Sequence, residues 1–266
     1  MQARQDADLI KQTLIVFDLD GTLTETKSPM DKEMSGLLKA LLKKKIVAVI
    51  GGGKYDVFKS QFIGHLRAPT KLLGNLFLFP TTATAFYRYA SGWKKVYELK
   101  LTKREKQAIR KAFQEAFREV GYVHPKKVYG SVIEDRGTQV TFSALGQEIV
   151  ASLGQRGVEL KKQWLAGNKK IKMKLARALQ RRLPNLEVRA AGYTSIDVTK
   201  KGIDKAYGIR QIEKHLHVPK RQMLFIGDAL FPGGNDFAVR RTGVKCIAVS
   251  GPKQTKQFIR SWLGVL

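Results

Sequence analysis

Short, wholly apolar runs recur in the first and last parts of the chain. They lie at residues 14–17, 46–50, 76–79, 223–226 and 246–249, and they are rich in the β-branched and aromatic residues that favour strands. Between them, apolar residues return every three or four positions, which is typical of amphipathic helices. A strand covered by helices on both sheet faces is apolar throughout, so this pattern predicts an α/β fold with a doubly wound parallel sheet.

Two helices of this α/β part have clear sequence signals. Asp31 stands where an N-cap is expected, because an amphipathic stretch begins directly after it. The apolar face of that stretch consists of Met34, Leu37, Leu38, Leu41 and Leu42. Residues 204–216 have the same helical spacing.

The middle of the chain has a different pattern. Thr102 and Glu105 have the spacing of a capping box, which predicts a helix that ends at Gly121. Residues 138–145 alternate between polar and apolar, as in a strand with one exposed face. Asn168 is a candidate N-cap for a second helix.

These two patterns divide the chain into domains. Antiparallel strands with two helices suggest an α+β domain inserted into the sheet domain. We therefore expect a Rossmann-like core of residues 1–84 and 200–266, and a cap domain of residues 85–199.

The charge of the chain is strongly positive. The sequence has 49 Lys and Arg against 22 Asp and Glu, a formal net charge of +27. Such a field attracts anions, which include phosphorylated metabolites and nucleic acid. Residues 160–182 hold nine of these cations, no acid and a single aromatic, Trp164. Bases stack on aromatic side chains, so a solvated helix face is favoured there and nucleic-acid binding is the alternative.

The single cysteine and the lack of a long apolar run indicate the cellular compartment of the protein. Cys246 is the single cysteine, which excludes an internal disulfide framework and suggests a reducing environment. Residues 1–6 lack the apolar stretch of a signal peptide, and no apolar run approaches the roughly 20 residues that span a membrane. We expect a cytoplasmic protein without membrane partners.

Acidic residues follow two of the predicted strands. Asp18 and Asp20 come directly after the first strand, and Asp228 and Asp236 follow the strand at 223–226. Ligands of open α/β sheets bind beyond the carboxyl ends of the strands, so these side chains should share one edge. Mg²⁺ prefers a few carboxylates together with phosphate oxygens. We expect these four residues to form a magnesium site.

The two acidic motifs resemble a known family. The chain has Asp-x-Asp-Gly-Thr-Leu-Thr at 18–24 and Pro-Gly-Gly-Asn-Asp at 232–236. Both resemble motifs of the haloacid-dehalogenase-like phosphatase superfamily with a type IIB cap. The most similar members are eukaryotic-type phosphomannomutases and their bacterial hydrolase relatives. The resemblance covers nearly the whole chain, including the position of the inserted cap.

The resemblance implies a mechanism. Asp18 would attack phosphorus and form an aspartyl-phosphate, and Asp20 would protonate the leaving oxygen and then activate water or an acceptor hydroxyl. Lys205 stands in Gly-Ile-Asp-Lys, which is similar to the segment whose lysine balances the charge of the nucleophile. Mg²⁺ would neutralise the phosphoryl oxygens.

The phosphate loop departs from the family pattern. The superfamily has a Ser or Thr after the second strand, and phosphomannomutases have Gly-Gly-Ser. This chain has Gly51-Gly52-Gly53, followed by Lys54. Backbone N–H groups can bind an anion without a hydroxyl, so we expect Gly52 and Gly53 to contact the substrate phosphate.

The cap departs from the pattern as well. Arg136 matches one of the arginines that hold the distal phosphate in phosphomannomutases, but Tyr129 and Gln147 replace two others. Ser195 and Asp197 match a segment that touches the sugar.

The replacement of two cap arginines favours hydrolysis over the mutase reaction, because a mutase must bind phosphate at both ends of its intermediate. We expect hydrolysis of a phosphorylated small molecule, a sugar phosphate. A phosphomannomutase-type mutase is the alternative, and a basic nucleic-acid-associated protein with a degenerate site is the second one. Phosphomannomutases pair through their caps, so the resemblance also implies a homodimer that forms through the cap.

Overall fold

The chain folds into two compact units. The computed structural model describes residues 11–264. One unit, here called the core, comprises the described residues up to Glu98 and those from Asp204 onward, and the other, the cap unit, is Leu99–Ile203. None of the described helices is long and apolar enough to cross a membrane. The residues on which the expected absence of a signal peptide depends, 1–6, lie outside this range.

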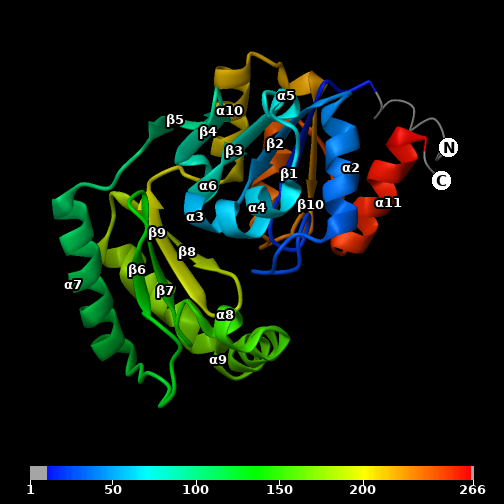
Figure 1. Cartoon of the computed structure of the whole chain (residues 1–266). Helices are drawn as coiled ribbons and strands as arrows, with labels where there is room; N and C mark the ends of the chain where they lie inside the picture. The colour runs from blue at the N-terminus through cyan, green and yellow to red at the C-terminus, as the bar shows by residue number, and fades with distance from the viewer. Residues whose placement is uncertain (1–10, 265–266) are drawn as a thin grey trace. The chain divides into compact units, whose positions relative to one another are not determined.

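A mixed, mostly parallel sheet forms the middle of the core (Figure 1). Within the described residues it has seven strands, in the order β11-β10-β1-β2-β3-β4-β5. The parallel strands are β1 (Leu14–Asp18), β2 (Ile46–Ile50), β3 (Leu76–Phe79), β10 (Met223–Gly227) and β11 (Lys245–Ala248). The expected α/β fold with a doubly wound sheet is confirmed.

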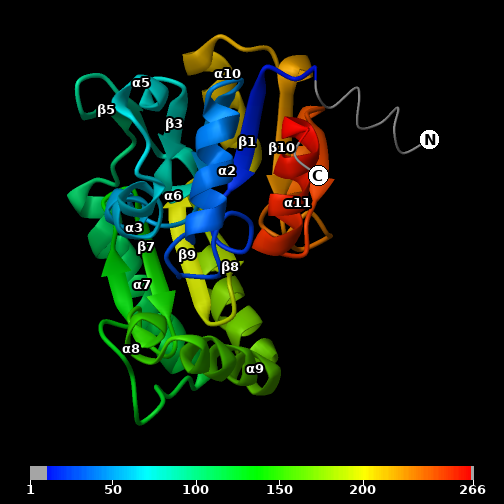
Figure 2. The ribbon, with the colours of Figure 1, turned by 45° about the vertical axis from the view of Figure 1, so that its right-hand side comes forward.

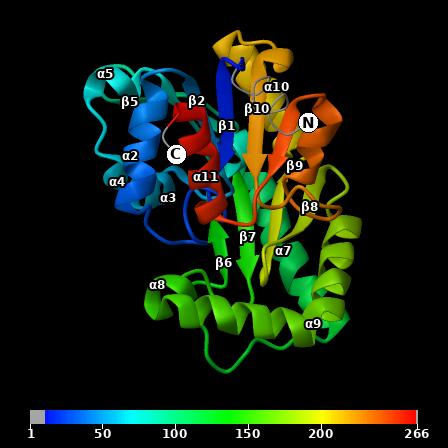
Figure 3. The same ribbon diagram turned by 90° about the vertical axis from the view of Figure 1, so that its right-hand side faces the viewer.

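Helices cover both faces of this sheet. Alternate residues of β1 explain why its strand is apolar throughout: Ile15 and Phe17 belong to one hydrophobic cluster, and Leu14 and Val16 belong to another. On the first face α2 (Lys32–Leu42) lies beside α11 (Pro252–Leu263) (Figure 3). On the second face lie α10 (Lys205–Leu216) and the 3₁₀ segment η3 (Phe237–Thr242).

Short elements complete the core. They are α3 (Tyr55–Phe58), the π-helical segment η1 (Lys59–Ile63), α4 (Gly64–Leu66), α5 (Thr70–Leu73), α6 (Pro80–Ala83) and the 3₁₀ segment η2 (Lys220–Gln222). The expected N-cap is present, because the Asp31 carboxylate accepts the N–H of Met34 at 2.8 Å.

The hairpin after β3 belongs to the core. Strand β4 (Ala85–Tyr89) pairs antiparallel with β3, and β5 (Trp93–Glu98) pairs with β4. The cap was expected to begin at residue 85, but these hydrogen bonds extend the core unit to Glu98.

The cap unit contains an antiparallel sheet (Figure 2), and its two long helices pack with that sheet in one hydrophobic cluster. Its described strands are ordered β6-β7-β9-β8. Their bounds are β6 Ile133–Asp135, β7 Gln139–Ser143, β8 Leu186–Ala191 and β9 Ser195–Lys200, and the helices are α7 (Lys103–Val120), α8 (Ile149–Leu153) and α9 (Gln155–Arg182). The capping box of α7 forms as expected, since Thr102 accepts the N–H of Glu105 and Glu105 accepts that of Thr102.

Two expectations about the cap elements were wrong. Asn168 caps no helix, because α9 is continuous from Gln155 to Arg182, and its side-chain amide donates to the carbonyl of Trp164 within the helix at 2.9 Å. Strand β7 has no exposed face: its polar residues Gln139, Thr141 and Ser143 are buried and hydrogen-bonded to other polar groups.

The basic stretch at 160–182 is not uniformly solvated either. Lys161 and Lys172 are each only 4% exposed. The exposed cations of this stretch include Lys169, Lys170 and Lys174. Helical spacing alone did not separate these two groups, because a lysine stem packs along apolar surface as readily as it extends into water.

Candidate active site

The carboxyl ends of the central strands bring the first acidic residue to the sheet edge. Asp18 is the last residue of β1 and is 4% exposed. It lies in register with Ile50 of β2, so the glycine loop starts beside it. On the other side Phe17 is in register with Ile226, so the loop after β10 starts at the same edge.

The Asp-Gly-Thr turn packs against the second acidic motif. Gly21 has a φ of +85°, and a Cβ added there would lie 2.6 Å from an oxygen of Asp228. Thr22 donates from its hydroxyl to the other oxygen of Asp228, at 3.3 Å. Glycine is therefore required at position 21 both by its left-handed backbone and by the close approach of a carboxylate.

Lys205 joins two of the carboxylates. It is the first residue of α10, which begins at an N-cap formed by Asp204 and the N–H of Tyr207 at 2.8 Å. The residue is 2% exposed, and its ammonium donates to Asp18 Oδ1 at 2.5 Å and also to Asp236 Oδ1. Burial opposes the charge of Lys205, but the carboxylates of Asp18 and Asp236 raise its pKa well above the ordinary range.

The acidic side chains form a cluster that a cation fits. One oxygen from each of Asp18, Asp228 and Asp236 lies within 4.8 Å of the others. Burial raises the pKa of Asp18, the Lys205 ammonium opposes this shift, and the charges of Asp236 and Asp228 add to it. Three carboxylates cluster around a single buried ammonium, which contacts only Asp18 and Asp236, so a hard cation with oxygen ligands would balance the remaining charge. The donor set thus suits Mg²⁺.

The other predicted members of the acidic set have different surroundings. Asp20 is not among the three clustered carboxylates of the described residues; its Oδ1 accepts the N–H of Lys27 at 2.6 Å. Its role as a metal ligand stays a prediction. Asp236 was expected in the magnesium site and does lie in the acidic cluster, where it also contacts Lys205 and its second oxygen accepts the N–H of Ala229 at 3.0 Å.

The glycine loop after β2 leaves space at one position and none at the next. A Cβ on Gly52 would meet no atom within 4 Å, whereas a Cβ on Gly53 would lie 2.8 Å from Val57 Cγ1. By the resemblance given in the sequence analysis, position 53 corresponds to the serine of the Gly-Gly-Ser pattern. The branched Val57 therefore occupies the room that a hydroxyl-bearing side chain would need.

Restoring that serine should work only together with a second change. We expect Gly53→Ser alone to lower the free energy of unfolding by about 1–3 kcal/mol, because it overpacks against Val57. Gly53→Ser with Val57→Ala should recover stability relative to the sum of the two single changes, a coupling of about 1 kcal/mol or more. Urea unfolding of the four proteins measures this coupling, and additive effects would contradict the steric explanation.

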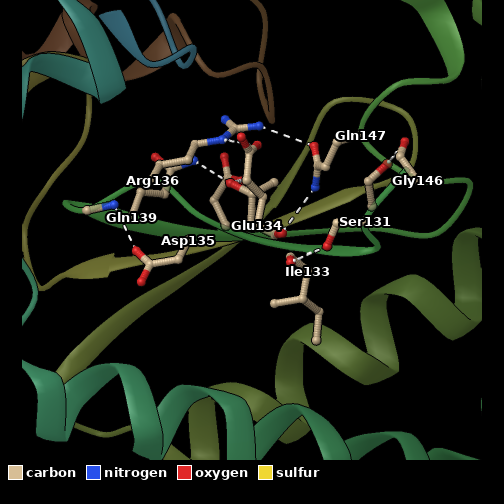
Figure 4. A network of polar contacts seen from close by, with 12 residues as sticks. Ser131, Ile133, Glu134, Asp135, Arg136, Gln139, Gly146 and Gln147 are labelled. Carbon is tan, nitrogen blue, oxygen red and sulfur yellow. Dashed lines mark hydrogen bonds and ion pairs between the residues drawn. The ribbon is translucent and has the colours of Figure 1, made fainter. Parts of the chain in front are cut away.

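A polar network lies on the cap sheet (Figure 4). Arg136 donates through Nε to Glu134 at 2.8 Å and through a terminal nitrogen to Gln147 at 3.2 Å. The Gln147 amide donates to the carbonyl of Thr141 at 3.1 Å, and the Thr141 hydroxyl donates to Asp197 at 2.8 Å. The structure therefore brings Arg136 and Asp197 into one connected network.

Ser195 and a buried lysine adjoin this network. Ser195 is the first residue of β9 and lies opposite Ser143. Burial raises the pKa of Asp197, with Arg136 as the strongest opposing charge. Lys172 donates to the carbonyls of Ala191 at 3.0 Å and Gly192 at 2.6 Å.

The sequence did not single out Lys172 as a candidate functional residue. Burial lowers its pKa to about 8, with Asp197 opposing the shift. No sequence signal distinguishes it from the other cations of α9.

Comparison with known proteins identifies similar chains. A family model described as haloacid dehalogenase-like hydrolase matches residues 15–237. A phosphomannomutase of Encephalitozoon cuniculi is 26% identical over 92% of this chain and 91% of its own length. Human phosphomannomutase 1 is 23% identical over 86% of this chain and 83% of its own length.

Solved structures show the same fold at lower identity. An IMP-nucleotidase of Plasmodium falciparum aligns with a TM-score of 0.69 at 17% identity, over 97% of this chain and 71% of that one. A trehalose-6-phosphate phosphatase of Aspergillus fumigatus aligns with a TM-score of 0.55 at 16% identity, over 97% of both chains.

Proposed function

The chain belongs to the haloacid dehalogenase-like hydrolases, and on that premise we propose that it is a Mg²⁺-dependent phosphomonoester hydrolase that acts on a sugar phosphate. That it is an enzyme of phosphatase or phosphomannomutase type follows from the family and the relatives. The observation that carries the proposal is the buried contact of Lys205 with Asp18 inside the acidic cluster.

The reaction assigns one role to each residue of the core site. Lys205 fixes the Asp18 carboxylate by its 2.5 Å hydrogen bond, so that the other oxygen can attack phosphorus. The P–O bond to the substrate breaks as the aspartyl-phosphate forms, and Asp20 gives its proton to the leaving oxygen. Asp20 then takes a proton from water, whose oxygen displaces Asp18 and releases phosphate. Bound between Asp18, Asp228 and Asp236, Mg²⁺ would supply charge neutralisation.

Hydrolysis is favoured over intramolecular transfer by the state of the cap network. A mutase must bind phosphate groups at both ends of its intermediate, which calls for several unsatisfied cations. Here Arg136 is paired with Glu134, and Gln147 uses its amide on Arg136 and on the Thr141 carbonyl. Each missing charge-assisted hydrogen bond to a second phosphate would cost about 1.5–3 kcal/mol.

Two other functions stay open to test. The mutase is supported by the phosphomannomutase of Encephalitozoon cuniculi, because this chain matches it over 91% of its length. A nucleic-acid-associated protein without turnover is supported by the +27 charge, but it gives no reason for a buried Lys205 between Asp18 and Asp236. We also propose that the enzyme acts in the cytoplasm, and that a homodimer, if one forms, uses the cap.

One screen separates these functions. Phosphate release is measured with Mg²⁺ over sugar phosphates, nucleoside monophosphates and p-nitrophenyl phosphate, beside the variant Asp18→Asn. We expect release from at least one sugar phosphate and none from the variant. Conversion of mannose-1-phosphate to mannose-6-phosphate with a bisphosphate activator would favour the mutase. Absence of any release, together with salt-dependent retention on RNA, would favour the third function.

A further inference from the structure

The segment α6, which follows β3, is not a regular right-handed helix, because three consecutive residues in it have a left-handed backbone. The φ angles of Thr81, Thr82 and Ala83 are +49°, +56° and +60°. L-residues rarely adopt this conformation, and β-branched threonine adopts it least readily. Strain of this kind persists only where the surrounding structure enforces it, and it concentrates at functional sites. The surroundings of the Thr81–Ala83 turn must therefore enforce this backbone.

Neighbouring groups hold the turn in place. The Thr84 hydroxyl donates to the Thr81 carbonyl at 2.7 Å, and the Tyr97 hydroxyl donates to the Ala83 carbonyl at 2.8 Å. Helix α10 packs against it at Gly208, where an added Cβ would lie 3.3 Å from that of Ala83 and would overlap Ile50. The same helix carries Lys205, so the turn is fixed to the element that positions the Asp18 carboxylate.

The turn is hydrogen-bonded to the glycine loop. The N–H of Thr81 donates to the Gly53 carbonyl at 2.8 Å, and the N–H of Thr82 donates to the Gly51 carbonyl at 2.9 Å. In a planar trans peptide the carbonyl and the following N–H point in opposite directions. Because two loop carbonyls point to the turn, the N–H groups of Gly52 and Lys54 point away from it.

This orientation suits an anion beside the nucleophile. The loop begins after Ile50, which is in register with Asp18. We propose that the Thr81–Ala83 turn is a positioning element that orients the loop, so that the N–H groups of Gly52 and Lys54 bind the phosphoryl oxygens. Held in this orientation, the two N–H groups would replace the side-chain hydroxyl that the loop lacks. The inference rests on the proposed phosphoryl transfer at Asp18.

Two substitutions of Thr82 test the role of the backbone. Both Thr82→Asn and Thr82→Gly keep the backbone N–H, but asparagine tolerates the left-handed conformation while glycine leaves the turn free to move. The probe is inorganic phosphate with Mg²⁺, titrated by calorimetry. We expect Thr82→Asn to bind phosphate within about twofold of the wild type, and Thr82→Gly about tenfold more weakly, the equivalent of one hydrogen bond to a charged group.

The other outcomes overturn the inference. Unchanged phosphate binding by Thr82→Gly would show that the turn does not orient the loop. Equal weakening by both variants would assign the effect to the threonine side chain, and a wild type that binds no phosphate would remove the anion site. A melting temperature measured for each variant controls for folding, since we expect Thr82→Gly to melt no lower than the wild type because it relieves strain.

Hydrolysis of p-nitrophenyl phosphate separates this inference from the proposed function. A wild type that binds phosphate as expected but hydrolyses no ester would contradict the proposed function and leave the turn's role intact. A wild type that hydrolyses the ester, beside a Thr82→Gly variant with equal phosphate binding and equal kcat, would contradict the turn's role alone.

Discussion

Replacing Asp18 by Asn should lower phosphoester turnover by at least about 10⁴-fold, because an amide oxygen cannot form the aspartyl-phosphate. The geometry of the site should survive, since Asn has the same shape and its oxygen can still accept the proton of Lys205 that Asp18 Oδ1 now accepts. Initial rates with p-nitrophenyl phosphate and Mg²⁺ measure the loss. The matched control is Asp56→Asn, which changes an exposed carboxylate outside the acidic cluster.

Although Asp18→Asn should lower turnover, it should raise the stability of the metal-free protein. Burial raises the pKa of Asp18, so the folded chain binds this proton more tightly than the unfolded chain does. The metal-free wild type should therefore gain stability as the pH falls through the raised pKa towards the ordinary value of 3.8. Asp18→Asn should be more stable than the wild type in EDTA at neutral pH, and its stability should depend less on pH.

Magnesium should reverse that order. At about 100 times its dissociation constant, a ligand that binds only the folded state stabilises it by about 2.7 kcal/mol. The wild type should show this gain in thermal melts, and Asp18→Asn should show less because one of three clustered carboxylates is gone. Equal turnover by Asp18→Asn, or equal Mg²⁺ stabilisation of both proteins, would contradict the assignment of Asp18.

Removing the Lys205 ammonium should have the largest effect on folding. Lys205→Met keeps the length of the side chain but leaves Asp18 and Asp236 buried without their shared partner. Breaking a buried ion pair in this way costs about 3–5 kcal/mol. We expect a loss of this size in urea unfolding without metal, together with loss of turnover.

A second substitution should partly repair this variant. Lys205→Met with Asp236→Asn removes one of the two uncompensated carboxylates, so it should be more stable than Lys205→Met alone. The exposed Lys253 provides the control, because Lys253→Met should stay within about 0.5 kcal/mol of the wild type. A loss below about 1 kcal/mol for Lys205→Met would show that the contact with Asp18 and Asp236 contributes little to the fold.

Local patterns in the sequence were sufficient for much of the architecture. The strands β1, β2, β3 and β10 were predicted within one residue, because a strand buried on both faces must be apolar at every position. The caps at Asp31 and Thr102 were found because a cap depends only on a side chain and a backbone N–H three residues later. The hairpin β4–β5 was assigned to the wrong part, because its pairing with β3 is not encoded in its own alternation.

For the site, the sequence by itself determined which residues carry acid, base and glycine at the strand ends, since motif spacing and strand periodicity are local properties. The tertiary structure alone decided their partners. Lys205 meets Asp18 from 187 positions away, and Val57 fills the space beside Gly53. The role proposed for Thr81 and Thr82 depends on their left-handed backbone and on their hydrogen bonds to the glycine loop, which only the structure shows. The partner of a buried charge, and the cause of a strained turn, depend on how distant segments pack, which no local pattern contains.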